Sequence, residues 1–130
     1  MNEFLKSMTV ASSGMAAQSA RLRISAENIA NSDTPGYRRK VIPFQQVVDQ
    51  KTGAQTVRTG RLFLDQSELE RIYDPAHPLA DEDGYFDGTN VNMLIEIADS
   101  REAQRSYEAN LKMFDQSRKM ASSILELLRR

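Results

Sequence analysis

The chain has 130 residues, 40% of them hydrophobic and 27% charged, which is the composition of one folded domain and excludes a disordered chain. Its 17 basic and 18 acidic residues give a net charge of −1, which argues against a general nucleic-acid binder. The absence of cysteine excludes disulfides and thiolate metal sites.

Residues 2–30 are predicted to form a long helix with an apolar stripe. The segment holds no proline and is rich in Ala, Ser, Gln, Leu and Met. Large apolar residues recur every seven positions, which keeps them on one stripe of a slightly under-wound helix and suits helix pairing. Small residues on both sides of Gly14 would let a neighbouring backbone come close. The stripe consists of Met1, Met8, Met15, Leu22 and Ile29.

The residues after position 30 carry strong signals for a helix end. Asn31 suits the left-handed backbone that closes many helices. Pro35 cannot continue a helix, and it moves Thr34 out of the helical region. Pro35 and Gly36 fit the two central positions of a type II turn, where glycine supplies the positive φ.

The middle of the chain changes to an extended pattern. Residues 38–64 are rich in β-branched and bulky side chains and predict short strands, with turns near Thr52–Gly53 and Thr59–Gly60. Residues 65–90 form a polar connector whose prolines and glycines predict turns. Asn92 or Asn90 is the expected N-cap of the segment that follows.

Residues 93–130 are predicted to form the longest helix. The segment lacks glycine and proline, and at ~1.5 Å per residue it would run for roughly 57 Å, a length that favours coiled-coil packing. One apolar stripe contains Tyr107, Leu111, Phe114, Ala121, Leu125 and Leu128, and a second contains Met113, Met120, Ile124 and Leu127. The apolar face is therefore wide enough for more than one neighbour.

These elements predict a mainly α protein in which long N- and C-terminal helices pack as a coiled coil. Residues 1–32 and 91–130 would form a discontinuous helical core, and residues 33–90 a small β-rich or extended middle segment. We define the assembly seam as the apolar positions expected to join copies of the chain. They are Met8, Met15, Leu22, Ile29, Tyr107, Leu111, Phe114, Ala121, Leu125 and Leu128.

No catalytic, cofactor or metal site is predicted. His77, the single histidine, has no second histidine or cysteine to complete a familiar zinc set. Asp81, Asp83 and Asp87 fail the EF-hand spacing, because Phe86 stands where that loop needs glycine. The N-terminus lacks the pattern of a cleaved signal peptide, and no run approaches the ~18 apolar residues of a membrane helix.

The stretch 25–38 resembles the signature of bacterial flagellar rod and hook proteins. Residues 73–78, 84–85 and 106–110 are similar to the proximal rod members of that family. The signature residues are Asn28, Ala30, Asn31, Thr34, Pro35, Gly36 and Tyr37.

The resemblance implies a structural subunit rather than an enzyme, without cofactors. Such proteins are exported from the cytoplasm by the flagellar type III export apparatus without a cleaved signal peptide. They polymerise into the rod, a drive shaft and export channel that crosses the periplasm and is required for motility. Their terminal helices form the inner tube wall.

The implied partners are other proximal and distal rod proteins, the export apparatus, and the basal adaptor between the MS ring or export gate and the rod. Nucleic acids and small-molecule substrates are not among them. The alternative is a helical adaptor or chaperone of a type III secretion system, with its termini paired inside one chain.

Overall fold

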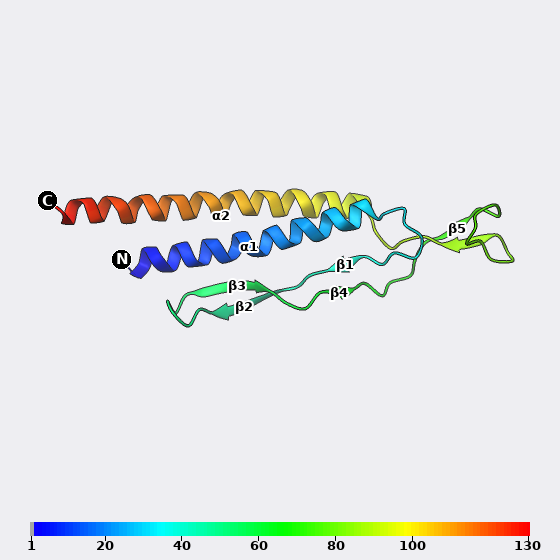
Figure 1. The fold of residues 1–130 in the computed structure, drawn as a ribbon, viewed down its shortest axis with the longest axis horizontal. Coiled ribbons are helices and arrows are strands. Elements are labelled where there is room, and N and C mark those ends of the chain that lie inside the picture. Colours follow the sequence, from blue (N-terminus) through cyan, green and yellow to red (C-terminus); the bar gives the residue numbers. More distant parts are fainter. Residues whose placement is uncertain (1) are drawn as a thin grey trace.

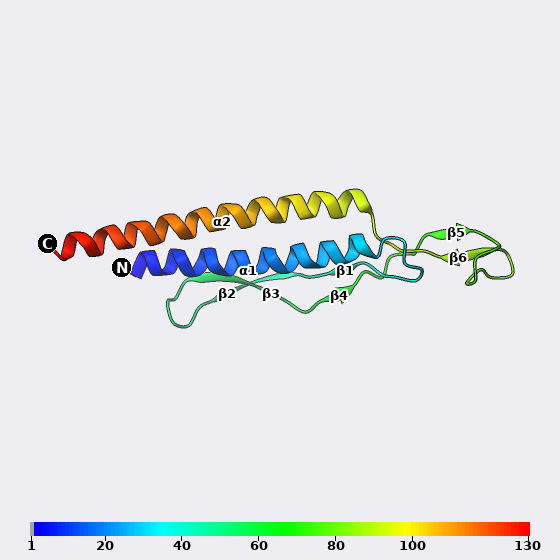
Figure 2. The same ribbon diagram turned by 45° about the horizontal axis from the view of Figure 1, so that its top comes forward.

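The computed structural model describes residues 2–130, so Met1 of the predicted stripe lies outside the described residues. Two long helices, α1 (Asn2–Ala30) and α2 (Met93–Leu128), run antiparallel and side by side (Figures 1 and 2). Two terminal helices flanking a middle segment with short strands confirm this part of the fold prediction. Coiled-coil packing of the helices stays a prediction.

Small side chains form the contact between α1 and α2. Ala11 and Ala103 are fully buried, and among the described residues Ile24 is the only large hydrophobic side chain that is buried. A Cβ added to Gly14 would lie 2.7 Å from the side-chain amide of Asn110. The two helices approach closely because the side chains between them are short.

A long two-stranded ribbon folds back along α1. The part beside the C-terminal half of α1 pairs β1 (Lys40–Val41) with β4 (Phe63–Leu64) (Figure 1). The part nearer the N-terminus of α1 pairs β2 (Phe44–Val48) with β3 (Gln55–Thr59), and both pairs are antiparallel (Figure 1). The backbone N–H of Val57 donates to the Ser13 hydroxyl at 3.2 Å, which ties β3 to α1. The ribbon thus covers the side of α1 that faces away from α2 (Figures 1 and 2).

Only one of the two turns expected in the ribbon is present. The chain reverses at Gly53, which has a φ of 71°. At Gly60 it continues from β3 to β4, and the Gly60 N–H donates to the carbonyl of Pro43 on the facing strand at 2.7 Å. The turn expected at Thr59–Gly60 was wrong, because that glycine takes part in cross-strand pairing.

A second hairpin projects from the end of the molecule opposite to the two termini (Figures 1 and 2). It pairs β5 (Arg71–Tyr73) with β6 (Tyr85–Asp87) inside the segment where we expected only turns. The rings of Tyr73 and Tyr85 lie 5.0 Å apart, and Arg71 forms an ion pair with Asp87 at 3.0 Å. These cross-strand pairs stabilise strands of three residues each.

The predicted start of α2 is confirmed, whereas the predicted backbone at the end of α1 is wrong. Asn92 is the N-cap of α2, as expected, and its side chain accepts from the N–H groups of Leu94 and Ile95. Asn31 does not take the left-handed backbone, since no non-glycine residue in the described chain has a positive φ. Its side chain instead donates to the carbonyl of Glu27 at 2.8 Å, so α1 ends without a left-handed residue.

Candidate assembly surface

Asn28 joins the end of α1 to the extended segment that follows. Its side chain is 1% exposed. The Oδ1 atom accepts from the Tyr37 hydroxyl at 2.7 Å and from the Lys40 N–H at 2.9 Å, and Nδ2 donates to the Lys40 carbonyl at 3.0 Å. Burial raises the pKa of the Tyr37 phenol, and the nearby Glu27 carboxylate adds to this effect. The buried Asn28 amide therefore satisfies both the N–H and the carbonyl of Lys40.

The rest of the family signature forms the predicted turn. The Tyr37 N–H donates to the Thr34 carbonyl at 3.1 Å, and Gly36 has a φ of 79°, as a type II turn requires. The Gly36 N–H also reaches the carbonyl of Gly88 at 3.0 Å, which connects the turn to the strand before α2. Ala30 and Pro35 are exposed and make no side-chain hydrogen bond, since neither carries a polar side-chain group.

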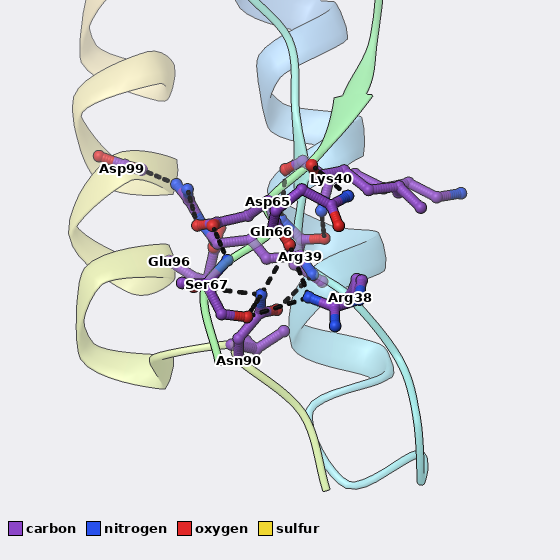
Figure 3. A network of polar contacts seen from close by, with 12 residues as sticks. Arg38, Arg39, Lys40, Asp65, Gln66, Ser67, Asn90, Glu96 and Asp99 are labelled. Atoms are coloured by element: carbon purple, nitrogen blue, oxygen red, sulfur yellow. Dashed lines mark hydrogen bonds and ion pairs between the residues drawn. The ribbon is translucent and has the colours of Figure 1, made fainter. Parts of the chain in front are cut away.

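An ion-pair network then joins the middle segment to α2. We call it the polar junction, and it consists of Arg39, Asp65, Asn90, Glu96 and Asp99 (Figure 3). The Arg39 Nε lies 2.5 Å from Oε1 of Glu96, and the same guanidinium lies 3.6 Å from Asp99 and 3.8 Å from Asp65. Asp99 also pairs with Arg21 of α1 at 3.2 Å. One arginine of the middle segment thus faces three carboxylates, two of them on α2.

Asn90 completes the polar junction. Its Oδ1 accepts from the Arg39 N–H at 2.6 Å, and its Nδ2 donates to the carbonyls of Asp65 and Ser67 (Figure 3). The Ser67 N–H bonds to Asp65 and, with its hydroxyl and nearby arginines, lowers the pKa of that carboxyl. The polar junction therefore connects three segments that are far apart in sequence: Arg39, residues 65–67 and residues 90–99.

Sequence reasoning missed most of this junction. Arg39 belongs to the short basic run 38–40, which by itself does not show that this arginine is salt-bridged. Glu96 could have been found, because it is a single carboxylate in the otherwise apolar run 93–97 at the start of a helix. Its partner is 57 positions away and no local pattern identifies it.

The helix α2 carries many exposed apolar side chains. Eleven of the twenty exposed large hydrophobic side chains of the described chain belong to this helix. Leu127 and Leu128 are 65% and 75% exposed. An exposed apolar surface of this extent is typical of a protein that buries it against another molecule. The eleven are Met93, Leu94, Ile95, Ile97, Leu111, Met113, Met120, Ile124, Leu125, Leu127 and Leu128.

Most residues of the assembly seam are at least partly covered inside the chain, and three are exposed. Ala121 is the single seam residue that is buried. Leu111, Leu125 and Leu128 are exposed on α2. The remaining six are half-buried: Met8, Met15, Leu22 and Ile29 on α1, with Tyr107 and Phe114 on α2.

A shallow groove brings two seam residues together near the termini. It has a volume of ≈ 540 Å³, and its lining combines the apolar Leu5, Met8, Ala16 and Phe114 with hydroxyl side chains of α1. The end of β2–β3 forms its other wall through Asp49 and Thr56. The groove has the character of a packing surface.

The described residues contain no cluster of His, Asp and Glu that could hold a metal ion. His77 stacks on Phe86 with ring centroids 3.9 Å apart, and its Nδ1 accepts from the Leu79 N–H at 3.1 Å. The Asp81 carboxylate accepts from the N–H groups of Asp83 and Tyr85, so this segment is a turn. Neither helix is long and apolar enough to cross a membrane.

Two family models match the chain. A model described as "Flagella basal body rod protein" matches residues 8–38, which span most of α1 and the signature turn. A model described as "Flagellar basal body rod FlgEFG protein C-terminal" matches residues 82–127, which span nearly all of α2.

The chain is also similar over nearly its full length to curated proteins, each named flagellar basal-body rod protein FlgC. The protein of Agrobacterium fabrum is 45% identical over 92% of this chain and 91% of its own. That of Borreliella burgdorferi is 37% identical over 94% and 95%, and that of Salmonella typhimurium is 35% identical over 91% and 92%.

Proposed function

The chain belongs to the FlgC family of flagellar basal-body rod proteins, and we propose that it builds the proximal rod by polymerising through its terminal helices. Membership makes it a structural rod subunit of the flagellar basal body rather than an enzyme. It also implies association with other rod and basal-body components.

The exposed apolar side chains of α2 carry this proposal. Each large apolar side chain transferred from water to a packed contact contributes about 1.5–3 kcal/mol when burial is complete. Leu111, Leu125 and Leu128 are the exposed members of the assembly seam. Neighbouring subunits would bury them and supply the free energy of association.

We assign the helices to the inner wall of a tube and the middle segment to its outside. Residues 1–32 and 91–130 would form the helical core, with α1 and α2 packed as a coiled coil, and residues 33–90 would lie outside it. The polar junction supports this division, because it fixes the orientation of the middle segment relative to both helices.

The same proposal covers location and partners. The rod would cross the periplasm as drive shaft and export channel. Its subunits would be exported from the cytoplasm by the flagellar type III export apparatus without a cleaved signal peptide. The chain would contact further copies of itself, other proximal and distal rod proteins, and the basal adaptor between the MS ring or export gate and the rod. Nucleic acids and small-molecule substrates would not be among its partners.

The second candidate is a helical adaptor or chaperone of a type III secretion system. The pairing of α1 with α2 inside one chain is the observation that favours it. That pairing leaves the outer side of α2 uncovered, which suits a subunit that joins further copies. The family to which the chain belongs also favours the rod.

Electron microscopy of basal bodies from a deletion strain tests the proposal. We expect basal bodies whose rod stops at its base, and non-motile cells. The intact gene should restore both the complete rod and motility. Complete rods in the deletion strain would contradict the proposal. Recovery of the chain with secretion partners in the cytoplasm, but not in basal bodies, would favour the adaptor.

A further inference from the structure

Helix α2 carries a second apolar stripe that is not part of the assembly seam. Its members follow one another at spacings of three and four, which places them on one side of the helix, and all of them are exposed. Leu111 of the seam and Met113 are two positions apart, about 200° around an α-helix, so these two side chains face different sides. We call the second stripe the methionine stripe, and it consists of Ala109, Met113, Gln116, Met120, Ile124 and Leu127.

The methionine stripe exposes two thioether side chains to solvent. Met113 and Met120 are 52% and 48% exposed, whereas Met8 and Met15 of α1 are half-buried. Met93 is 41% exposed, but it lies at the start of α2, roughly 30 Å from Met113 at ~1.5 Å per residue. Met113 and Met120 thus form the one pair of neighbouring exposed methionines in the described part of the chain.

Methionine is the most readily oxidised residue of this protein, because the chain has no cysteine and no tryptophan. A peroxide transfers one oxygen atom to the thioether sulfur. The O–O bond breaks, an S–O bond forms and water leaves when hydrogen peroxide is the oxidant, so the sulfur is oxidised and the peroxide is reduced. The product is a sulfoxide, which turns a flexible apolar side chain into a polar one.

We propose that Met113 and Met120 form an oxidation site for peroxides, and that their sulfoxides keep a modified copy out of the rod. In the free subunit each sulfoxide oxygen stays in water, so the fold is retained. Against a neighbouring subunit the oxygen would be buried, and Gln116 is the only member of the methionine stripe whose side chain could donate a hydrogen bond to it. This second step rests on the proposed function, because it requires neighbouring subunits to cover the methionine stripe.

Mass spectrometry of the purified full-length chain tests the oxidation site itself. After brief treatment with hydrogen peroxide, we expect Met113 and Met120 to gain an oxygen atom at least about fivefold faster than the half-buried Met8 and Met15. The far-ultraviolet circular dichroism should stay unchanged. Equal rates at the four residues would overturn the site, and so would loss of the helix signal when Met113 and Met120 are oxidised.

Two double variants test the effect on assembly in cells. Met113→Gln/Met120→Gln imitates the polarity of the sulfoxides, and we expect it to reduce swimming about tenfold or more while the purified chain keeps its helix signal. Met113→Leu/Met120→Leu is the matched control, because it removes both sulfurs and keeps both side chains apolar. It should swim normally. Normal swimming of the glutamine variant, or an equal defect in the leucine variant, would overturn the inference.

Isolated basal bodies give a third measurement. Neighbouring subunits should cover Met113 and Met120 there, so we expect both to be oxidised at least about tenfold more slowly than in the free chain. Basal bodies dissociated in urea should lose this protection. Equally fast oxidation in intact basal bodies would overturn the inference and leave the rod function in place. Complete rods in the deletion strain, in contrast, would remove the rod function itself, so the two failures can be told apart.

Discussion

The Nε atom of Arg39 lies 2.5 Å from Oε1 of Glu96, a carboxylate that is 1% exposed. Replacing Arg39 with Leu would leave this carboxylate buried without its cation, at a cost of about 3–5 kcal/mol in the free energy of unfolding. The double variant Arg39→Leu/Glu96→Leu should recover much of that loss, because neither charge remains. Urea unfolding followed by circular dichroism measures both.

A surface ion pair provides the control for Arg39. Arg118 pairs with Asp115 at 3.1 Å, and both side chains are about half exposed or more. Arg118→Leu should change stability by less than about 1 kcal/mol. If Arg39→Leu and Arg118→Leu lowered the free energy of unfolding equally, burial of Glu96 would not explain the effect at Arg39.

Asn28 and Tyr37 should differ in their effect on stability. Asn28→Ala would remove the partners of both the N–H and the carbonyl of Lys40, which we expect to cost about 2–3 kcal/mol. Tyr37→Phe would remove one donor and leave the Lys40 N–H bonded to Asn28, which we expect to cost about 1 kcal/mol. Thermal unfolding checks the order, and a larger loss in Tyr37→Phe would contradict it.

Gly14 should be required for the close contact of the helices. Leucine is a better helix former than glycine by up to about 1 kcal/mol, so an isolated α1 would gain from Gly14→Leu. In the chain the new side chain would meet the Asn110 amide, and we expect a net loss of stability. Adding Asn110→Ala should restore part of it. A thermal midpoint that rises in the single variant would contradict the contact.

The pH dependence of the β5–β6 hairpin should follow Asp81. The N–H of Tyr85, with Arg71 as a further partner, holds the pKa of the Asp81 carboxyl below its ordinary value. Because the pKa of Asp81 is lower in the folded hairpin, the Asp81 carboxylate stabilises the hairpin at pH values above the ordinary pKa of aspartate. This contribution disappears as the pH falls through the lowered pKa.

Nuclear magnetic resonance can follow this transition. We expect the Tyr85 amide signal to move in acid below the ordinary aspartate range, together with loss of contacts between the Tyr73 and Tyr85 rings. In Asp81→Asn the charge is absent at every pH, so the acid transition of the β5–β6 hairpin should disappear. Persistence of the same transition in that variant would assign it to another group.

Leu111→Asp and Leu125→Asp should abolish swimming without unfolding the chain. Both side chains are about half exposed, at 47% and 48%, so a carboxylate there stays in water in the free subunit. In an assembled seam the same carboxylate would be buried without a partner. Swimming on soft agar and the far-ultraviolet circular dichroism of the purified variants measure the two effects.

An exposed position on the same helix controls this test. Ser123→Asp adds the same charge outside the seam and should leave swimming unchanged. Normal swimming of Leu111→Asp would count against the seam, and loss of helix signal would assign the defect to folding instead.

The helices were predictable because their signals are local. Residues 93–128 hold no glycine or proline, and Asn92 caps them through its own side chain. The stripe that packs inside the chain was not predictable in the same way. Glu96, Ala103, Asn110 and Ser117 also recur every seven residues, and periodicity alone does not tell which stripe meets α1. The close approach at Gly14 selects the small residues.

Distance along the chain explains the other differences. The strands β5 and β6 lie in a segment rich in turn residues, and they pair residues up to sixteen positions apart, such as Arg71 with Asp87. Arg39 and Glu96 are likewise joined only by the fold. The signature turn, in contrast, was predicted from the adjacent Pro35 and Gly36, since that turn type depends on their own backbone preferences.

The position of α1 between α2 and the ribbon has a genetic consequence (Figures 1 and 2). Lesions on most of α1 damage the molecule itself, because both of its sides touch other parts of the same chain. Mutations at exposed positions of α2 leave the fold of the free subunit intact and affect only its contacts with neighbouring proteins. Suppressors of the first kind should therefore map within this gene, and suppressors of the second kind in the genes of the proteins beside it.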